Sequence, residues 1–306
     1  MRKLFLNVQG GLGLNIACSS FITEYSDEAD FYVCSPYYDV YIANNKVKAA
    51  YKPNEIRDFI FDAKSEDGEI VTIRLYDLSD FIYKRLDYTQ AWCKLCGLEY
   101  RGKSVKSILD PLSKYPFLTK QVNDYLTKIR DYKDFIIVQF TGGQSPLVNV
   151  PDGDWSKVQY NYDNEPLKRH YPTEKAQEFC DLYHEKHPDT AIIVYGLPNE
   201  PSPRGDYIFK TTIPYLAYYE LAKNERCKGT VSIDSSLQHL VAGVVKSVVI
   251  WGHSTPNNFG YDFNKNIVQK CRRDDILYFT QLGPSGAKID YIEPKELLEE
   301  VEAYLL

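Results

Sequence analysis

Short apolar runs alternate with amphipathic segments along most of this chain, which is the pattern of strands and helices in a parallel α/β sheet. In the first half, strands are predicted at residues 4–8, 31–33 and 70–75, and helices at 14–25, 54–61, 87–97 and 118–132. A second series begins with the apolar run at 135–140. Its further strands are predicted at 190–195, 229–233 and 247–251, and its helices at 173–186, 213–224, 236–242 and 294–305.

The restart of the pattern near residue 131 predicts two Rossmann-like domains, at 1–130 and 131–290. The alternation of strands and helices predicts parallel, doubly wound sheets, and their crossovers are expected to be right-handed. Such sheets bind ligands beyond the carboxyl ends of their strands, so the cleft between the two domains is the expected active site.

Composition adds limits to this picture. A chain of 306 residues with 25% charged side chains can bury a sizeable core in each of two domains. No apolar run approaches the ~18 residues of a membrane span, and the sequence turns polar soon after Met1, so we expect a cytoplasmic protein. Cys93 and Cys96 are expected to pack inward from a helix as reduced thiols. The net charge of −6 gives no electrostatic reason to expect nucleic acid.

The segment 230–256 concentrates the candidate chemistry. Asp234 ends a predicted strand, Ser235 and Ser236 form a turn, and His239 lies on the short helix that follows. An acidic group, free hydroxyls and a helix N-terminus thus meet at the carboxyl ends of neighbouring strands, where α/β sheets bind phosphates and other ligands.

The same residues also have a plainer interpretation. Asp234 could cap the helix by accepting the N–H group at about Leu237, since Asp and Ser are common N-cap residues. His239 could hydrogen-bond a sugar or phosphate, or satisfy the packed turn.

Several short matches carry a resemblance to a known family. They are Asp-Ser-Ser at 234–236, His-Leu at 239–240, Ala242, Val-Val-Ile-Trp-Gly at 248–252 and Thr-Pro at 255–256. Together they resemble the donor-site segment of the lipopolysaccharide heptosyltransferase family, whose members are GT-B glycosyltransferases that use nucleotide-activated sugars. The resemblance is strongest over 229–260. It implies a GT-B-like α/β fold, catalysis without a metal ion or other cofactor, and a C-terminal helix at 291–306 that packs back toward the N-terminal domain.

Two further segments suit the donor phosphates. Thr141, Gly142 and Gly143 follow the first strand of the second domain, where hydroxyl and N–H donors fit a diphosphate and where glycines also serve ordinary turns. The segment 168–172 resembles the family's Lys-His-Trp-Pro motif, which aligns Arg169 with a phosphate-binding lysine. A guanidinium can clamp two phosphate oxygens and stabilise the departing nucleotide. Without the resemblance, this basic cluster is a solvated entrance to a helix.

Acidic residues in two loops complete the donor side. Glu200 follows the strand at 190–195, and a carboxylate there commonly accepts ribose hydroxyls, although an exposed glutamate is the more ordinary interpretation. Asp152 and Asp154 have the D-x-D spacing of metal-dependent glycosyltransferases, but they lie in a loop rich in Pro and Gly, so a turn is expected there.

The first strand-to-helix turn forms the expected acceptor-side loop, with Gly11, Gly13 and Asn15. The glycines do not complete the dinucleotide pattern G-x-G-x-x-G, because its third glycine falls at Ile16. In the heptosyltransferase family this turn carries an Asp that serves as the base. Here Leu14 and Asn15 follow Gly13, and Asn15 can hydrogen-bond a hydroxyl but cannot take its proton.

Three functions remain open from the sequence. The first is a metal-independent glycosyltransferase with Arg169, Asp234 and Asn15 as catalytic candidates and no assigned base. The second is a catalytically inactive nucleotide-sugar-binding protein, motivated by the missing Asp. The third is a dinucleotide-dependent oxidoreductase, which the incomplete glycine pattern disfavours. A glycan or lipopolysaccharide-type molecule is the expected acceptor. A lipid-linked glycan, a free sugar, a protein and a hydroxylated base in DNA remain possible, although the acidic net charge disfavours DNA.

Overall fold

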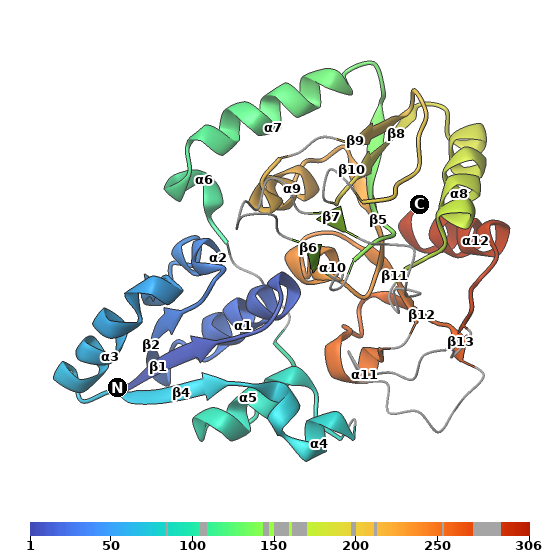
Figure 1. Cartoon of the computed structure of the whole chain (residues 1–306). Helices are drawn as coiled ribbons and strands as arrows, with labels where there is room; N and C mark the ends of the chain where they lie inside the picture. Colours follow the sequence, from blue (N-terminus) through green and yellow to red (C-terminus); the bar gives the residue numbers. More distant parts are fainter. Residues whose placement is uncertain are drawn as a thin grey trace.

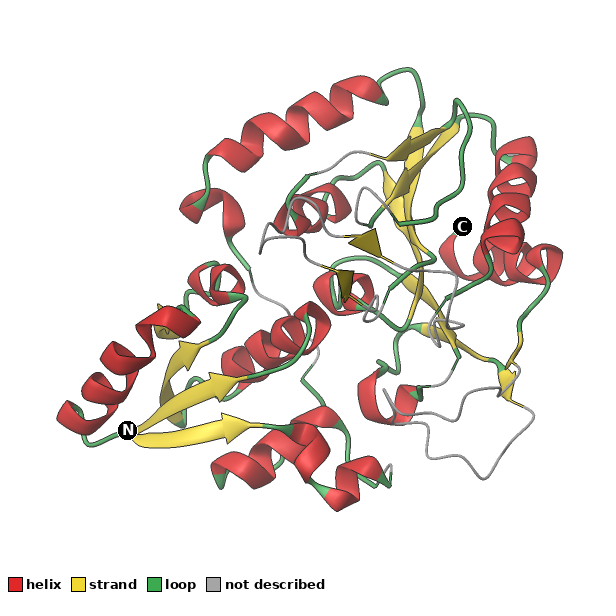
Figure 2. Cartoon of the chain, viewed as in Figure 1, coloured by secondary structure: helices red, strands yellow, loops and turns green. Residues whose placement is uncertain are grey.

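A computed structural model of the chain contains two separate parallel sheets, which confirms the predicted α/β architecture (Figure 1; Figure 2). The residues that the structure describes are 1–83, 85–104, 109–142, 147–149, 159–160, 170–196, 200–210, 213–252, 254–271 and 289–306. The domain boundaries at 130 and 290 stay predictions.

The N-terminal sheet has the strand order β3-β2-β1-β4, and all of its pairs are parallel. Its strands are β1 (Arg2–Val8), β2 (Ala29–Cys34), β3 (Val47–Tyr51) and β4 (Glu69–Ile73). The α-helices of this part are α1 (Leu12–Glu24), α2 (Tyr38–Ile42), α3 (Ile56–Ser65), α4 (Ser79–Ile82) and α5 (Tyr88–Cys96), with 3-10 turns at Pro53–Glu55 and Leu75–Asp77. Strand β3 and helix α2 were not predicted, because they are short and half-exposed and lack an apolar run.

The C-terminal sheet has the order β12-β11-β10-β5-β8-β9, again with every pair parallel. Its strands are β5 (Asp134–Gln139), β8 (Thr190–Val194), β9 (Ile208–Lys210), β10 (Cys227–Ile233), β11 (Ser247–Trp251) and β12 (Lys265–Val268). The helices that follow α5 along the chain are α6 (Pro111–Lys114), α7 (Phe117–Lys128), α8 (Thr173–Lys186), α9 (Tyr215–Ala222), α10 (Ser236–Leu240), α11 (Pro256–Phe259) and α12 (Pro294–Leu305). Two short antiparallel pairs complete the structure: β6 (Leu147–Asn149) with β7 (Gln159–Tyr160), and β13 (Lys270–Cys271) with β14 (Ile289–Asp290).

Strand order locates the ligand crevice of this sheet. The chain runs outward from β5 through β8 to β9, then returns to the other side of β5 and continues from β10 through β11 to β12. The direction of winding therefore changes between β5 and β10, and the crevice at such a switch point is where open α/β sheets bind ligands.

Helix α12 packs on the C-terminal sheet, which corrects the expectation that it braces the N-terminal domain. Its apolar stripe of Leu297, Leu298 and Val301 is buried in the same core cluster as strands β5, β8, β10 and β11, and its main contacts are with α8, β10 and β11. The ion pair between Lys186 Nζ and Glu302 Oε2, at 2.9 Å, lies along the contact with α8. The apolar stripe of α12 thus buries itself against α8 and the C-terminal sheet, in its own lobe.

The cysteine pair behaves as predicted. Cys93 and Cys96 are free thiols buried on α5, and burial raises the pKa of Cys96. Among the described residues, no group of His, Cys, Asp and Glu is placed to hold a metal ion. No helix in the described ranges is both long and apolar enough to cross a membrane.

Candidate functional site

The switch point between β5 and β10 brings together two loops that are far apart in sequence. Gly142 follows β5, and Ser235 follows β10. A Cβ atom at position 142 would stand 2.5 Å from the Ser235 hydroxyl oxygen and 3.3 Å from Ile233 Cδ1. The two loops therefore lie in contact, and only glycine fits at position 142.

Gln139, which the sequence interpretation missed, ties these loops together. It is the last residue of β5 and is only 3% exposed. Its Oε1 accepts a hydrogen bond from the Leu237 N–H at 3.2 Å, and its Nε2 donates to Ser235 Oγ at 3.0 Å. A glutamine near the end of the apolar run at 135–140 was the available signal, because a buried amide needs partners.

The capping role considered for Asp234 is wrong. The Leu237 N–H that Asp234 would have accepted is bonded to Gln139, and the residue in the N-cap position is Ser235. Asp234 is buried, and its Oδ1 accepts from Gln238 Nε2 at 2.8 Å. The carboxylate of Asp234, which precedes α10, is thus held by the side chain of Gln238 on that helix.

Ser236 faces a buried tyrosine. The Tyr195 hydroxyl lies 2.9 Å from Ser236 Oγ and comes from the residue directly after β8. Burial raises the pKa of Tyr195, so the phenol is neutral and able to donate. Hydroxyl groups from β8 and α10 therefore border the same crevice.

Thr141 and Glu200, which were predicted independently, are in contact. Thr141 Oγ1 donates to Glu200 Oε2 at 3.2 Å, and Lys210 Nζ donates to the Glu200 carbonyl at 2.6 Å. Glu200 and Lys210 line a surface depression of about 730 Å³. A Cβ at Gly196 would stand 2.8 Å from Glu200 Oε2, so the glycine after β8 admits this carboxylate.

The acceptor-side loop meets α10 directly. A Cβ at Gly13 would lie 3.0 Å from His239 Cδ2 and 3.3 Å from Ser236 Cα, and α1 packs beside α10 (Figure 1). His239 is buried at this contact, with its Nδ1 2.8 Å from the Tyr261 hydroxyl. His239 thus belongs to the seam between the two sheets. A Cβ added at Gly11 would have no atom of the described residues within 4 Å.

Asn15 is enclosed by protein groups. Its side chain is fully buried, and its Nδ2 donates to the carbonyls of Gly11 at 3.0 Å and Gly10 at 3.3 Å. Its Oδ1 accepts from the Ser35 hydroxyl at 2.6 Å and the Tyr41 hydroxyl at 2.9 Å. The side chain therefore holds two loops together.

The remaining predicted residues lie outside the described ranges or next to their ends. Gly143, Arg169 and the Asp152–Asp154 pair lie outside the described residues. The end of the basic motif is described: Tyr171 N donates to the Phe140 carbonyl at 3.0 Å, next to the end of β5. Burial lowers the pKa of the adjacent His170 to about 4, so this imidazole is neutral at pH 7.

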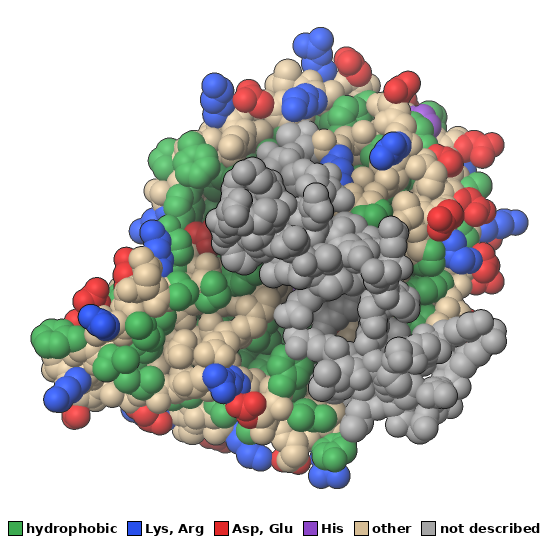
Figure 3. All heavy atoms as spheres, viewed as in Figure 1, with side chains coloured by type: hydrophobic (Ala, Val, Ile, Leu, Met, Phe, Trp, Pro, Cys, Tyr) green, Lys and Arg blue, Asp and Glu red, His purple; other side chains and the backbone are tan. Residues whose placement is uncertain are grey.

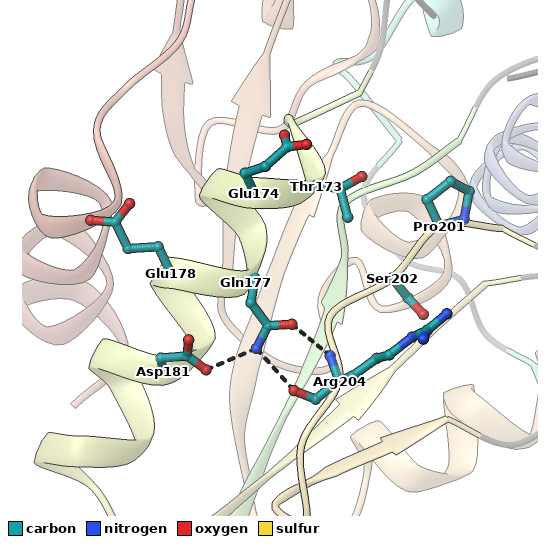
Figure 4. A pocket seen from close by; sticks show the side chains of 8 residues that line it. All are labelled: Thr173, Glu174, Gln177, Glu178, Asp181, Pro201, Ser202 and Arg204. Carbon is teal, nitrogen blue, oxygen red and sulfur yellow. Dashed lines mark hydrogen bonds between the residues drawn. The ribbon is translucent and has the colours of Figure 1, made fainter. Parts of the chain in front are cut away.

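A second depression of about 590 Å³ lies between α8 and the segment 201–204 (Figure 4). Gln177 holds this segment, because its Oε1 accepts from Arg204 N at 2.8 Å and its Nε2 donates to the Arg204 carbonyl at 2.9 Å. Three carboxylates line the depression, at Glu174, Glu178 and Asp181. Their charge is unfavourable for a diphosphate, so the switch point is the better candidate for the donor.

No protein-family model and no curated protein matches the chain. Among solved structures, E. coli ADP-heptose LPS heptosyltransferase II aligns with a TM-score of 0.58 at 12% identity, covering 100% of this chain and 98% of that one. The E. coli heptosyltransferase WaaC with ADP aligns with a TM-score of 0.55 at 11% identity, covering 99% of both chains.

The chain has a GT-B glycosyltransferase fold. The resemblance noted in residues 229–260 is thus confirmed at the level of the fold, over the length of the chain. At 12% identity the similarity to that structure is one of fold alone. In this chain the loop that holds Gly13 lies against α10, which follows the switch point of the C-terminal sheet.

Proposed function

We propose that this chain is a metal-independent glycosyltransferase that moves a sugar from a nucleotide-sugar donor to an acceptor hydroxyl. The observation that carries the proposal is the contact between Gly142 and Ser235 at the switch point, with Ser236 and Thr141 beside it. Two loops that meet through a glycine and two serines expose backbone and hydroxyl donors in the crevice where this fold class binds phosphates.

Each residue of the proposed nucleotide-sugar site has a role in this proposal. The N–H and hydroxyl groups of Ser235 and Ser236 bind the diphosphate, with Thr141 and the glycines after it. Glu200 accepts the ribose hydroxyls from the rim of the depression that it lines. Asp234 accepts hydroxyls of the sugar. Arg169 stabilises the departing nucleotide through the role that the resemblance implies, so no metal ion is required for departure.

The two structural neighbours guide the choice of donor and acceptor. One was solved with ADP, so an ADP-activated sugar is the first donor to test. A glycan or lipid-linked glycan is the preferred acceptor class. Acidic and basic side chains are interspersed over the described part of the face in Figure 3, and the net charge is −6, which disfavours DNA as the acceptor. We also propose that the protein acts in the cytoplasm, where nucleotide sugars are available.

Calorimetry followed by a transfer assay tests the proposal. Titration with ADP, UDP, GDP, CDP and dTDP is expected to identify one diphosphate that binds. The corresponding nucleotide sugars, incubated with p-nitrophenyl glycosides, are expected to release that diphosphate. Binding without release would identify the nucleotide-sugar-binding alternative. Binding of NAD but of none of the five diphosphates would overturn the proposal in favour of an oxidoreductase.

A further inference from the structure

Transfer to a hydroxyl requires a group that takes the acceptor's proton. The position after Gly13 carries Leu14, and Asn15 is an amide whose two ends are bonded to protein groups. The base must therefore be another carboxylate at the carboxyl edge of the N-terminal sheet, the edge whose Gly13 loop lies against α10.

Asp39 lies at this edge. Strand β2 ends at Cys34, opposite Asn7 near the end of β1, and α2 begins at Tyr38. The segment between them thus emerges next to the loop that holds Gly11 and Gly13. Asp39 is half-buried in the first turn of α2.

Asn15 fixes the segment that carries Asp39. Its Oδ1 accepts from Ser35 and from Tyr41, on either side of Asp39 in sequence, at 2.6 and 2.9 Å. The amide that cannot act as a base thereby anchors both ends of a segment that presents a carboxylate. This arrangement gives the buried Asn15 a clear physical purpose.

Tyrosines connect Asp39 to the donor side. Tyr215 is the first residue of α9 in the C-terminal lobe, and burial together with the adjacent Asp39 carboxylate raises its pKa. Tyr37, whose pKa is raised by burial and by Asp39, is an electrostatic neighbour of Tyr195. Tyr195 in turn bonds Ser236 at 2.9 Å. Tyrosine hydroxyls thus interact electrostatically with Asp39 at one end and bond the donor loop at the other.

The described part of the chain supplies no cation that offsets the charge of Asp39. Within the described ranges, no lysine or arginine forms an ion pair with its carboxylate. The nearby Lys52 is directed elsewhere, with its Nζ 4.6 Å from the centre of the Tyr38 ring. Asp39 is thus half-buried, and the tyrosines Tyr37 and Tyr215 are its neighbours.

We propose that Asp39 is the general base of the transfer. Its carboxylate takes the proton of the acceptor hydroxyl as that oxygen forms a bond to the anomeric carbon. The bond from the anomeric carbon to the diphosphate oxygen breaks, and the nucleoside diphosphate leaves with the electron pair. Asp39 ends the step protonated and returns its proton to water. This inference rests on the proposed transferase function.

The test compares Asp39→Asn with the wild-type protein, using ADP-, UDP- and GDP-activated hexoses as donors and p-nitrophenyl glycosides or water as acceptors. Loss of a general base is expected to lower kcat by roughly 10²- to 10⁴-fold. The Kd of the nucleoside diphosphate, measured by calorimetry, is expected to stay within about twofold because the donor loops are untouched. Formate added to Asp39→Ala is expected to restore part of kcat, which a purely structural role would not permit.

Asp58→Asn is the matched control, because Asp58 is an exposed carboxylate on α3 of the same lobe. It is expected to leave kcat and Kd unchanged. Wild-type kcat in a folded Asp39→Asn protein, or a lowered kcat in Asp39→Ala that formate does not raise, would overturn the assignment of Asp39 alone. A wild-type protein that binds no diphosphate, or binds one without turnover, would instead overturn the transferase function and this inference with it.

Discussion

Gly142 and Ser235 lie so close together that a single methyl group between them would stand 2.5 Å from the serine hydroxyl oxygen. The contact joins the loop after β5 to the loop after β10, which are separated by almost a hundred residues of chain. Both loops hold residues that are proposed to donate hydrogen bonds to the diphosphate. The separation of the loops therefore fixes the shape of the nucleotide-sugar crevice.

Replacing Gly142 with Ala is expected to push these loops apart. The added Cβ cannot be accommodated without moving Ser235, so the affinity for the nucleoside diphosphate should fall by at least about tenfold, or ~1.4 kcal/mol. Calorimetry measures this loss. Gly11→Ala serves as the folding control, since no atom of the described residues lies within 4 Å of its added methyl group. Unchanged affinity in Gly142→Ala would mean that the contact does not shape the binding site.

Gln139→Leu is expected to destabilise the protein and weaken the donor site together. The substitution leaves the Leu237 N–H without its acceptor in a buried position, which costs about 1–3 kcal/mol of unfolding free energy. Denaturant unfolding monitored by circular dichroism measures this change. Gln139→Glu keeps an acceptor for Leu237 and should recover part of the stability. Equal stability of Gln139→Leu and wild type would show that solvent replaces the lost bond.

Asp234→Asn separates charge from shape. The variant keeps an oxygen for Gln238, and α10 retains its start because Gln139 binds the Leu237 N–H. We therefore expect a Tm within a few degrees of wild type and at least ~10-fold weaker donor use in kcat/KM, about 1.4 kcal/mol of transition-state binding. Undiminished transfer by the folded variant would restrict Asp234 to a structural role.

Asn258 is expected to stabilise the contact between the lobes. Its Nδ2 donates to the Phe81 carbonyl at 3.1 Å and to the Leu86 carbonyl at 2.7 Å, both on the N-terminal side of the seam. Asn258→Ala should lower the unfolding free energy by about 1–3 kcal/mol through the unsatisfied carbonyls. The neighbouring Asn257, whose side chain is exposed, gives the matched control Asn257→Ala, which should be neutral. Equal Tm values for the two variants would contradict the prediction.

His170 predicts a pH dependence of stability. Burial lowers its pKa from 6.5 to about 4 in the folded protein, so the unfolded chain binds the proton more readily. The free energy of unfolding should therefore fall as the pH decreases from 6.5 toward 4 and level off below that. His170→Gln should show a shallower dependence across this window when both proteins are unfolded with urea. Parallel pH profiles for the two would exclude His170 as a source of the effect.

Periodicity and apolar runs were sufficient for the inner strands of both sheets and for the longer helices. The helices Thr173–Lys186 and Pro294–Leu305 and the strand Ser247–Trp251 have the predicted bounds, because each is a long or strongly apolar segment with clear ends. Strand β3 was missed, and so was β12, since both lie at sheet edges with half-exposed side chains and carry little pattern of their own. The position of α12 was also wrong, because an amphipathic stripe specifies that a helix packs but leaves its partner open.

By itself, the sequence determined two βα series, their parallel sheets and the candidate residues at the ends of the strands, since these follow from local patterns of polarity. Only the tertiary structure decided which of those residues meet. Gln139 binds α10, Asn15 anchors the segment with Asp39, and Thr141 contacts Glu200, all across large distances in sequence. A hydrogen bond between distant loops depends on strand order and on the close approach of backbones at Gly13 and Gly142. The spacing of residues along the chain specifies neither of these features.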